Sequence, residues 1–291
     1  MKPAPFRYRR AATLAEAVAE LAAAPGRARV LAGGQTLVQE MSARLAAPEI
    51  VVDLGRVPGL DSVDVDAEVV RIGAMRTIAA IEVDQRLAGV LPALVEAARR
   101  IAHPAVRNRG TIGGNIAHAD PASGIPPVLL AHAGEVVVTG PAGTRTIAAT
   151  DFFTGYRTTA NALDEIITEV RFPRPGARTG SAFVEISRRA TGWGLAGACV
   201  VVRLDGGGAV DELRIGLLGL APTAVRAARV EHDASGRVLD AAAIAELAQA
   251  AVAGLEAVPA DVHASAQLRR SLGQVSVRRA LTEAVGRAMG A

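Results

Sequence analysis

Residues 29–41 read RVLAGGQTLVQEM, in which a short apolar strand passes through a glycine-rich turn into a segment with helical spacing. Before this stretch, Thr13 and Glu16 form a capping box that predicts a helix ending at the Pro25-Gly26 pair. After it, the apolar residues 50–52 predict a second strand. The order helix, strand, glycine turn, helix and strand is typical of a small α/β unit.

A second glycine-rich turn, GTIGGN at residues 110–115, lies inside a long irregular segment from His103 to Gly124. Irregular segments of this length are usually functional or disordered, and the firm apolar patterns on both sides favour function. Paired glycines let the backbone approach a ligand and let successive N–H groups point into one concavity, which suits phosphate oxygens. Two such turns that converge from separate units would bind both phosphates of a diphosphate, although a simple tight turn is the alternative for each.

The remaining pattern divides the chain into three parts. Turn residues near Arg56–Gly59 and the cluster Pro173–Gly176 mark the two boundaries. We therefore expect an N-terminal unit, a second unit and a C-terminal domain, at residues 1–56, 57–175 and 176–291. The C-terminal domain is expected to hold three strands and then two helices, at residues 182–187, 195–204, 210–220, 241–254 and 267–289.

The composition limits the classes of function. Half of the 291 residues are hydrophobic, and 32 Lys and Arg stand against 29 Asp and Glu, a net charge of +3. This predicts a globular fold and argues against nucleic acid as the main partner. The single Cys199 excludes disulfides, cysteine-based zinc sites and iron–sulfur clusters built from this chain alone, and its apolar surroundings predict a buried, inert thiol. Neither a membrane-spanning stretch nor a signal peptide pattern is present, so we expect a cytoplasmic protein.

Common catalytic signatures are absent from the sequence, namely GxSxG, HExxH, a Walker loop and a GxGxxG between a strand and a helix. His118 and Asp120 lie two residues apart and could form an acid–base pair, but their spacing in an extended loop favours a hydrogen-bonding role. The alternating acids Asp64, Asp66 and Glu68 lack the glycine and the spacing of a calcium loop. The residues therefore predict neither a catalytic acid or base nor a metal site.

The two glycine motifs, LAGGQTLVQEM at 31–41 and IAHPAVRNRGTIGGNIAHADPASGIPP at 101–127, closely resemble the FAD-binding (medium) subunit of molybdenum hydroxylases. This is the carbon monoxide dehydrogenase and xanthine dehydrogenase family. Similar stretches are TGYRTTA at 154–160, DEIITEVRFP at 164–173 and SAFVEISRRA at 181–190, so the resemblance covers almost the whole chain. It implies an α+β fold: a vanillyl-alcohol-oxidase-type FAD-binding fold of two α+β subdomains, then a C-terminal α+β domain with a three-stranded antiparallel sheet and helices.

The resemblance also implies which residues contact FAD. The first glycine turn would bind the diphosphate through Val30, Leu31, Ala32, Gly33, Gly34, Gln35, Thr36 and Leu37. The second would contribute Thr111, Gly113, Gly114 and Asn115, with His118 and Asp120 continuing around the dinucleotide. The apolar Ile101 and Ile167 match positions near the flavin.

Three positions along this expected cofactor surface depart from the family's pattern. Where this chain has Gly124, relatives often carry an acid that holds the adenosine ribose, a contact of about 1.5–3 kcal/mol in general. Val184 stands where some relatives have lysine. Trp193 lies in a Thr-Gly-Trp-Gly stretch where many relatives read Gly-Asp-aromatic-Ala, and we expect it either near the isoalloxazine or in the core. The affinity for FAD, or the electron acceptor, would differ accordingly.

The resemblance implies an FAD-binding electron-transfer subunit. The other cofactors would lie on partners: a large subunit with a molybdenum–pterin cofactor and a small subunit with two [2Fe–2S] clusters, assembled as a dimer of heterotrimers. Electrons would pass from the clusters to FAD and then to an external acceptor. Two alternatives stay open, a self-contained flavin-dependent oxidase or dehydrogenase and a non-catalytic scaffold subunit that has lost FAD.

Overall fold

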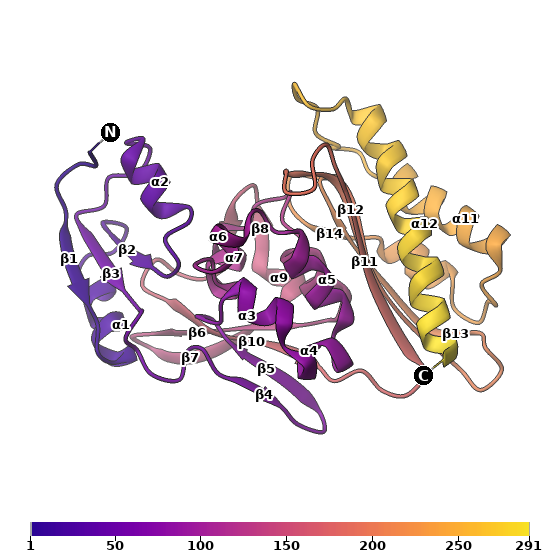
Figure 1. Ribbon diagram of the computed structural model, residues 1–291, viewed down its shortest axis with the longest axis horizontal. Coiled ribbons are helices and arrows are strands. Elements are labelled where there is room, and N and C mark those ends of the chain that lie inside the picture. Colours follow the sequence, from indigo (N-terminus) through magenta and orange to yellow (C-terminus); the bar gives the residue numbers. More distant parts are fainter. Residues whose placement is uncertain (1, 291) are drawn as a thin grey trace.

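A three-stranded parallel sheet forms the N-terminal part of the chain (Figure 1). The computed structural model describes residues 2–290. Strand β3 (Ile50–Asp53) lies between β1 (Arg7–Arg10) and β2 (Ala28–Leu31). The sequence pattern does not predict β1, because its four residues are all exposed and none of them marks a buried face.

The two helices predicted beside this sheet are present. Helix α1 (Leu14–Ala22) begins after Thr13, whose hydroxyl accepts the Glu16 N–H at 3.2 Å, and its apolar face packs with the sheet in one buried cluster. Helix α2 (Leu37–Ser42) follows the first glycine turn directly. The small α/β unit is therefore confirmed, with one additional strand.

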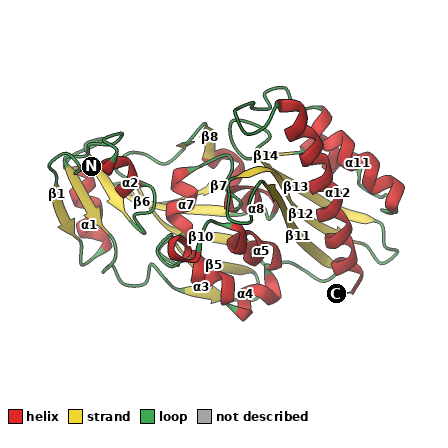
Figure 2. Cartoon of the chain, turned by 45° about the horizontal axis from the view of Figure 1, so that its top comes forward, coloured by secondary structure: helices red, strands yellow, loops and turns green. Residues whose placement is uncertain are grey.

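A five-stranded antiparallel sheet forms the middle of the molecule (Figure 2). Its order is β4 (Val63–Val65), β5 (Val69–Gly73), β10 (Ile166–Pro173), β6 (Glu135–Gly140) and β7 (Gly143–Ala148). The helices that pack over it include α3 (Ile78–Val83), α4 (Gln85–Val90), α5 (Pro92–Arg100) and α8 (Ile125–Ala131). Helix α9 (Ala149–Phe152) leads into a separate two-stranded sheet of β8 (Phe153–Gly155) and β9 (Thr158–Thr159).

The segment expected to be irregular, from His103 to Gly124, contains two short helices. Helix α6 (Pro104–Arg107) starts with a proline at its first position. Helix α7 (Ile112–His118) begins after Thr111, whose hydroxyl accepts the Gly114 N–H at 3.1 Å. The loop prediction is wrong here, because helices of one or two turns give too little apolar periodicity to be recognised.

A four-stranded antiparallel sheet forms the C-terminal part: β11 (Thr179–Ser187), β12 (Gly194–Leu204), β13 (Val210–Leu218) and β14 (Val225–Arg226). The three predicted strands are present as β11, β12 and β13, but the prediction misses β14. This fourth strand has only two residues and no pattern of its own. Helix α10 (Ala228–Asp233) follows it. The two long C-terminal helices are confirmed as α11 (Ala241–Ala253) and α12 (Ala266–Gly290).

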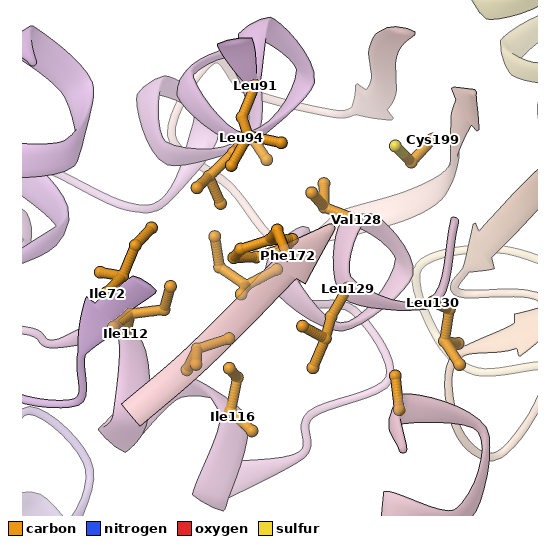
Figure 3. Packing of buried hydrophobic residues seen from close by; sticks show 14 of the residues in the cluster. Ile72, Leu91, Leu94, Ile112, Ile116, Val128, Leu129, Leu130, Phe172 and Cys199 are labelled. Carbon is orange, nitrogen blue, oxygen red and sulfur yellow. The ribbon is translucent and has the colours of Figure 1, made fainter. Parts of the chain in front are cut away.

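The C-terminal sheet is packed on both faces. Helices α11 and α12 cover one face, and α5 and α8 lie against the other. On that second face, Cys199 belongs to the same buried cluster as Phe172 and Val128 of the central unit (Figure 3). Phe183 is a member of this cluster as well. Cys199 is buried, as predicted, and burial raises the pKa of its thiol well above its usual range. The second unit and the C-terminal domain thus share one continuous core.

Candidate cofactor-binding site

The two glycine turns come together, although about 75 residues of sequence separate them. A methyl group built on Gly33 would lie 1.9 Å from the carbonyl oxygen of Arg109. A methyl group on Gly114 would lie 3.8 Å from the Cβ atom of Ala32. Only glycine allows the backbone of the first turn to approach the second this closely, so the contact itself explains Gly33.

The first turn offers unused hydrogen-bond donors. Within residues 2–290, the backbone N–H groups of Gly33, Gly34, Gln35 and Thr36 have no acceptor. Gly34 has φ +74°, a left-handed conformation that turns the chain sharply, and the side chain of Gln35 donates back to the Gly33 carbonyl at 3.3 Å. Consecutive free amides in a tight turn form a concavity that suits an anion, and these residues are only partly buried.

The second turn is different, because its amides are already used. The N–H of Gly113 donates to Ala74, the N–H of Gly114 to the Thr111 hydroxyl, and the N–H of Asn115 to the Thr111 carbonyl. Gly113 is buried against Ala74, so it serves close packing. The expectation that successive amides of both turns face one anion is therefore wrong for the second turn, because Ala74 and Thr111 accept the hydrogen bonds of these amides.

Asn115, the residue after Gly114, keeps part of its side-chain amide free. Its Oδ1 atom accepts the Ser123 hydroxyl at 2.7 Å, which leaves the two N–H groups of the amide without an acceptor in the described chain. The second turn can therefore contribute a side-chain donor, while its backbone positions the first turn.

Asp120 lies at the centre of a buried polar cluster. It is only 6% exposed, and its carboxylate accepts the Ala122 N–H at 2.9 Å and an Arg157 guanidinium N–H at 2.7 Å, with the His118 imidazole 3.6 Å away. Burial acts to raise the pKa of Asp120, but the nearby His118 imidazole and the hydrogen bonds from Ala122 and Arg157 outweigh it and lower the pKa to about 2. Asp120 therefore stays ionised near neutral pH and fixes the loop, as the hydrogen-bonding interpretation predicts.

Arg157 is a residue that the sequence reasoning missed as part of this cluster. It lies in the turn between β8 and β9, with φ +50°, and it reaches across 37 positions of sequence to Asp120. The TGYRTTA stretch was the available signal, because it repeats the family's pattern without an evident packing role.

The structure explains why position 124 holds glycine. A methyl group on Gly124 would lie 2.8 Å from the Cζ atom of Phe183 and 3.3 Å from the Ala97 methyl group. The aromatic ring thus fills the space that a side chain at this position would need. An acid is absent at position 124 because Phe183 of the C-terminal sheet and Ala97 of α5 pack there.

The other expected cofactor residues differ in where they lie. Ile101 follows α5 directly and packs at the edge of the central core, whereas Ile167 on β10 is buried within it. Val184 packs with the α11–α12 cluster, on the face of β11 opposite to Phe183, so the structure does not bring it to the glycine turns. Trp193 is 69% exposed in the turn between β11 and β12, which excludes the core position.

Known proteins resemble the chain along its whole length. Residues 4–175 match the family of the "FAD binding domain in molybdopterin dehydrogenase", and residues 181–284 match the "CO dehydrogenase flavoprotein C-terminal domain". The chain belongs to the FAD-binding medium subunits of molybdenum hydroxylases.

Relatives in this family are subunits of dehydrogenases. The 6-hydroxypseudooxynicotine dehydrogenase complex subunit alpha of Paenarthrobacter nicotinovorans is 38% identical, over 99% of this chain and 97% of that protein. The carbon monoxide dehydrogenase medium chain of Hydrogenophaga pseudoflava is 36% identical over 99% of both. A solved structure of carbon monoxide dehydrogenase from Hydrogenophaga pseudoflava, lacking the Mo-pyranopterin moiety, superposes with a TM-score of 0.94 at 37% identity, covering 99% of each chain.

Family membership gives the chain an FAD-binding domain and makes it a subunit of an oxidoreductase. Across residues 2–290, no helix has both the length and the apolar character needed to cross a bilayer. In the same part of the chain, no three or more His, Cys, Asp or Glu side chains are grouped so that they could hold a metal ion.

Proposed function

We propose that this chain holds FAD where the two glycine turns meet and carries electrons through it, within a heteromeric molybdenum hydroxylase. The first turn carries this proposal, because four consecutive backbone N–H groups without an acceptor are held against Arg109 by a contact that only glycine permits. Diphosphate oxygens are the natural acceptors for such a set of donors. An anion site of this kind fits the central part of FAD.

Each part of the site would have its own task. The amides of Gly33–Thr36 would donate to the diphosphate, and the Asn115 side chain would add a donor from the second turn. Val30, Leu31, Ala32 and Leu37 would line the approach to the turn, and the Asp120–Arg157 pair would fix the loop that follows. When bound, the flavin supplies the redox chemistry, since it exchanges both single electrons and pairs; the protein binds, orients and shields it.

The direction of electron flow follows from what this chain lacks. Its single, buried Cys199 cannot ligate an iron–sulfur cluster, so electrons that reach FAD through such clusters would come from another chain. We propose a small subunit with two [2Fe–2S] clusters as the donor and a large subunit with a molybdenum–pterin cofactor as the site of substrate oxidation. The words "medium chain" and "complex subunit" in the relatives' names support an assembly of several subunits. The form that we propose for it is a dimer of heterotrimers.

The expected division of the chain becomes part of this proposal. Residues 1–56 and 57–175 would each contribute one glycine turn to the FAD site. Residues 176–291 would close it from the side of β11.

Purification of the chain with and without its genomic neighbours tests the proposal. We expect a yellow chain that copurifies with a molybdenum-containing subunit and a cluster-containing subunit, and whose flavin is reduced by the substrate only in the full complex. A lone yellow protein that oxidises an organic substrate would instead establish a self-contained flavin enzyme. A chain that copurifies with such partners but shows no flavin absorption would establish the scaffold.

A further inference from the structure

A cavity of about 210 Å³ lies where the second unit joins the C-terminal domain. The linker after β10, residues 173–176, borders this cavity, and His132, which directly follows α8, lines it as well. The C-terminal sheet contributes side chains from β11, β12 and β13. The cavity shares no residue with the two glycine turns, so the proposed FAD site does not account for it.

The register of the strands explains why charged side chains reach this cavity. Val201 belongs to the shared core, and Arg203, two residues later on β12, lies on the same face of the sheet. On β13, Glu212 pairs with Arg203 and Arg214 pairs with Val201, so both of these side chains lie on this face too. The face that meets the central unit therefore becomes charged where the shared core ends.

His132 brings a buried polar group without a partner to the cavity. It is only 3% exposed, and its Nε2 atom has no hydrogen-bond partner within residues 2–290. The imidazole meets the ring of Phe172 edge to face, with the ring centroids 6.0 Å apart (Figure 3 labels Phe172). Burial, and after it the positive charge of Arg214, lower the pKa of His132 to about 4, so the ring is neutral near pH 7 and has one N–H to donate. A buried polar group of this kind needs a water or a ligand as its partner.

Two arginines of the sheet share one acid in the cavity. Glu212 contacts the Arg214 guanidinium and lies 3.8 Å from Nη2 of Arg203. Arg203 also donates to Asp211, outside the cavity lining, at 2.6 Å. A single carboxylate cannot neutralise two guanidinium groups, so the side chains of the sheet leave room for a second anion beside Glu212.

Arg174 adds a further positive charge from the linker. Its side chain is exposed and donates to the Asp66 carbonyl at 2.6 Å, and within the described chain it forms no ion pair. Three guanidinium groups thus line the cavity against one carboxylate. This balance of charge favours an anionic ligand, and a dianion most of all.

The shape and number of the donors favour a phosphate group. Guanidinium groups bind phosphate oxygens through paired N–H groups, and here they come from the linker, β12 and β13, with the imidazole of α8's last turn as a fourth donor. The cavity of about 210 Å³ is much larger than the roughly 30 Å³ that one water occupies. It is smaller than the about 300–1,000 Å³ of sites for drug-sized ligands. Its ligand is therefore a small phosphate compound.

We propose that this cavity binds the phosphate group of a small molecule, which Arg174 and His132 of the second unit hold together with Arg203 and Arg214 of the C-terminal domain. Inorganic phosphate and a phosphate monoester share this chemistry. Because the site takes residues from both parts of the chain, its ligand stabilises their junction and raises the Tm of the chain. The inference does not depend on FAD.

Calorimetric titration of the purified full chain, at an ionic strength kept constant with chloride, tests the proposal. The probes are inorganic phosphate, glycerol phosphate and succinate. We expect saturable binding of the two phosphate compounds, and the tighter of them shows whether the site takes the free ion or a monoester. Succinate is a dianion without phosphate geometry, and we expect it to bind at least about tenfold more weakly.

Arg174→Gln and Arg178→Gln form a matched pair of variants. Both arginines are exposed and each donates to one backbone carbonyl, that of Asp66 or of Asp205, but Arg178 does not line the cavity. Arg174→Gln should weaken the binding of phosphate by at least about tenfold relative to Arg178→Gln. Phosphate bound at the first glycine turn would be equal in both variants, so their ratio isolates the cavity.

Glu212→Gln should change the affinity in the opposite direction. It removes the carboxylate that competes with the ligand for Arg203 and Arg214, so phosphate should bind roughly three- to tenfold more tightly. Nuclear magnetic resonance of the histidine side chains then locates the ligand. The signals that are missing from His132→Gln identify His132, and in wild type they should shift as phosphate is added.

Three results would overturn the proposal. The first is no saturable binding of either phosphate compound by wild type at concentrations up to the order of 10 mM. The second is equal binding by Arg174→Gln and Arg178→Gln, or signals of His132 that do not move. The third is succinate that binds as tightly as phosphate, which contradicts the class of ligand. Circular dichroism identifies a variant that fails to fold, and the remaining variants then decide the test.

Discussion

The Gly33 backbone lies against the carbonyl oxygen of Arg109 so closely that a single added methyl group would be 1.9 Å from that oxygen. This contact joins the N-terminal sheet unit to the segment that leads into α7. It holds the free amides of the first turn close to the second turn. The geometry of the proposed diphosphate site therefore depends on the absence of one methyl group.

Gly33→Ala should release FAD while the C-terminal domain stays folded. The added methyl group must push the first turn away from Arg109, and it acts far from the core shared by Phe183 and Cys199. Flavin absorption per chain is expected to fall by at least about tenfold, which corresponds to roughly 1.4 kcal/mol of lost binding. Gly89→Ala is the matched control, because nothing lies within 4 Å of the methyl group added there. Equal flavin content in both variants would contradict the assignment of this turn.

Arg157→Ala should destabilise the chain by about 1–2 kcal/mol, because it removes one charged partner of a buried carboxylate. The loss is limited, since Arg157 is partly exposed and the Ala122 N–H still binds Asp120. Urea unfolding, monitored by circular dichroism, measures this difference. Arg229→Ala, at an exposed position, should change the free energy of unfolding by much less. A difference of zero between these two variants would show that Arg157 does not fix the loop.

His132 should make the chain sensitive to acid. Burial, with a smaller contribution from the positive charge of Arg214, lowers the pKa of its imidazole to about 4 from 6.5. Because the unfolded chain binds the proton more readily, this stability is present above pH 6.5 and is lost as the pH falls through 4. The loss amounts to about 3 kcal/mol. Thermal unfolding of His132→Gln should therefore vary less with pH than that of wild type in this range; parallel profiles would refute the shift.

Glu185 should make the flavin-free chain less stable as the pH rises, whereas His132 makes it less stable as the pH falls. Its pKa is raised to about 7 from 4.5 in the folded state, so this group's stability is present below pH 4.5 and is lost as the pH rises through 7. Relative to wild type, Glu185→Gln should gain about 3 kcal/mol between acidic and mildly alkaline pH, since glutamine stays neutral throughout. Urea unfolding at the two pH values measures the gain. A variant whose difference from wild type does not change with pH would show that the carboxyl titrates normally.

The sequence carries the main elements of the fold because their patterns are local. Thr13 caps α1, and the first glycine turn lies between an apolar strand and a helix, so residue types alone mark these positions. Strands β1 and β14 are not predicted, because they have no such local pattern. The first is wholly exposed and the second has two residues, and each exists only because a neighbouring strand pairs with it.

Local sequence patterns predict less of the candidate site than of the fold. Motif resemblance places both glycine turns, but only the folded chain shows that the Gly113 N–H donates to the Ala74 carbonyl and the Gly114 N–H to the Thr111 hydroxyl. Val184 and Glu185 are adjacent in sequence and lie on opposite faces of β11, so an error of one position changes which domain a side chain meets. The raised pKa of the Glu185 carboxyl depends on its burial in the folded chain, which no local pattern shows.

A crystal structure of the chain with FAD tests the central claim most directly. The account predicts diphosphate oxygens within about 2.7–3.2 Å of the backbone nitrogens of Gly33 to Thr36, with the Asn115 amide beside them. A diphosphate bound elsewhere, with those four amides facing water, would contradict it.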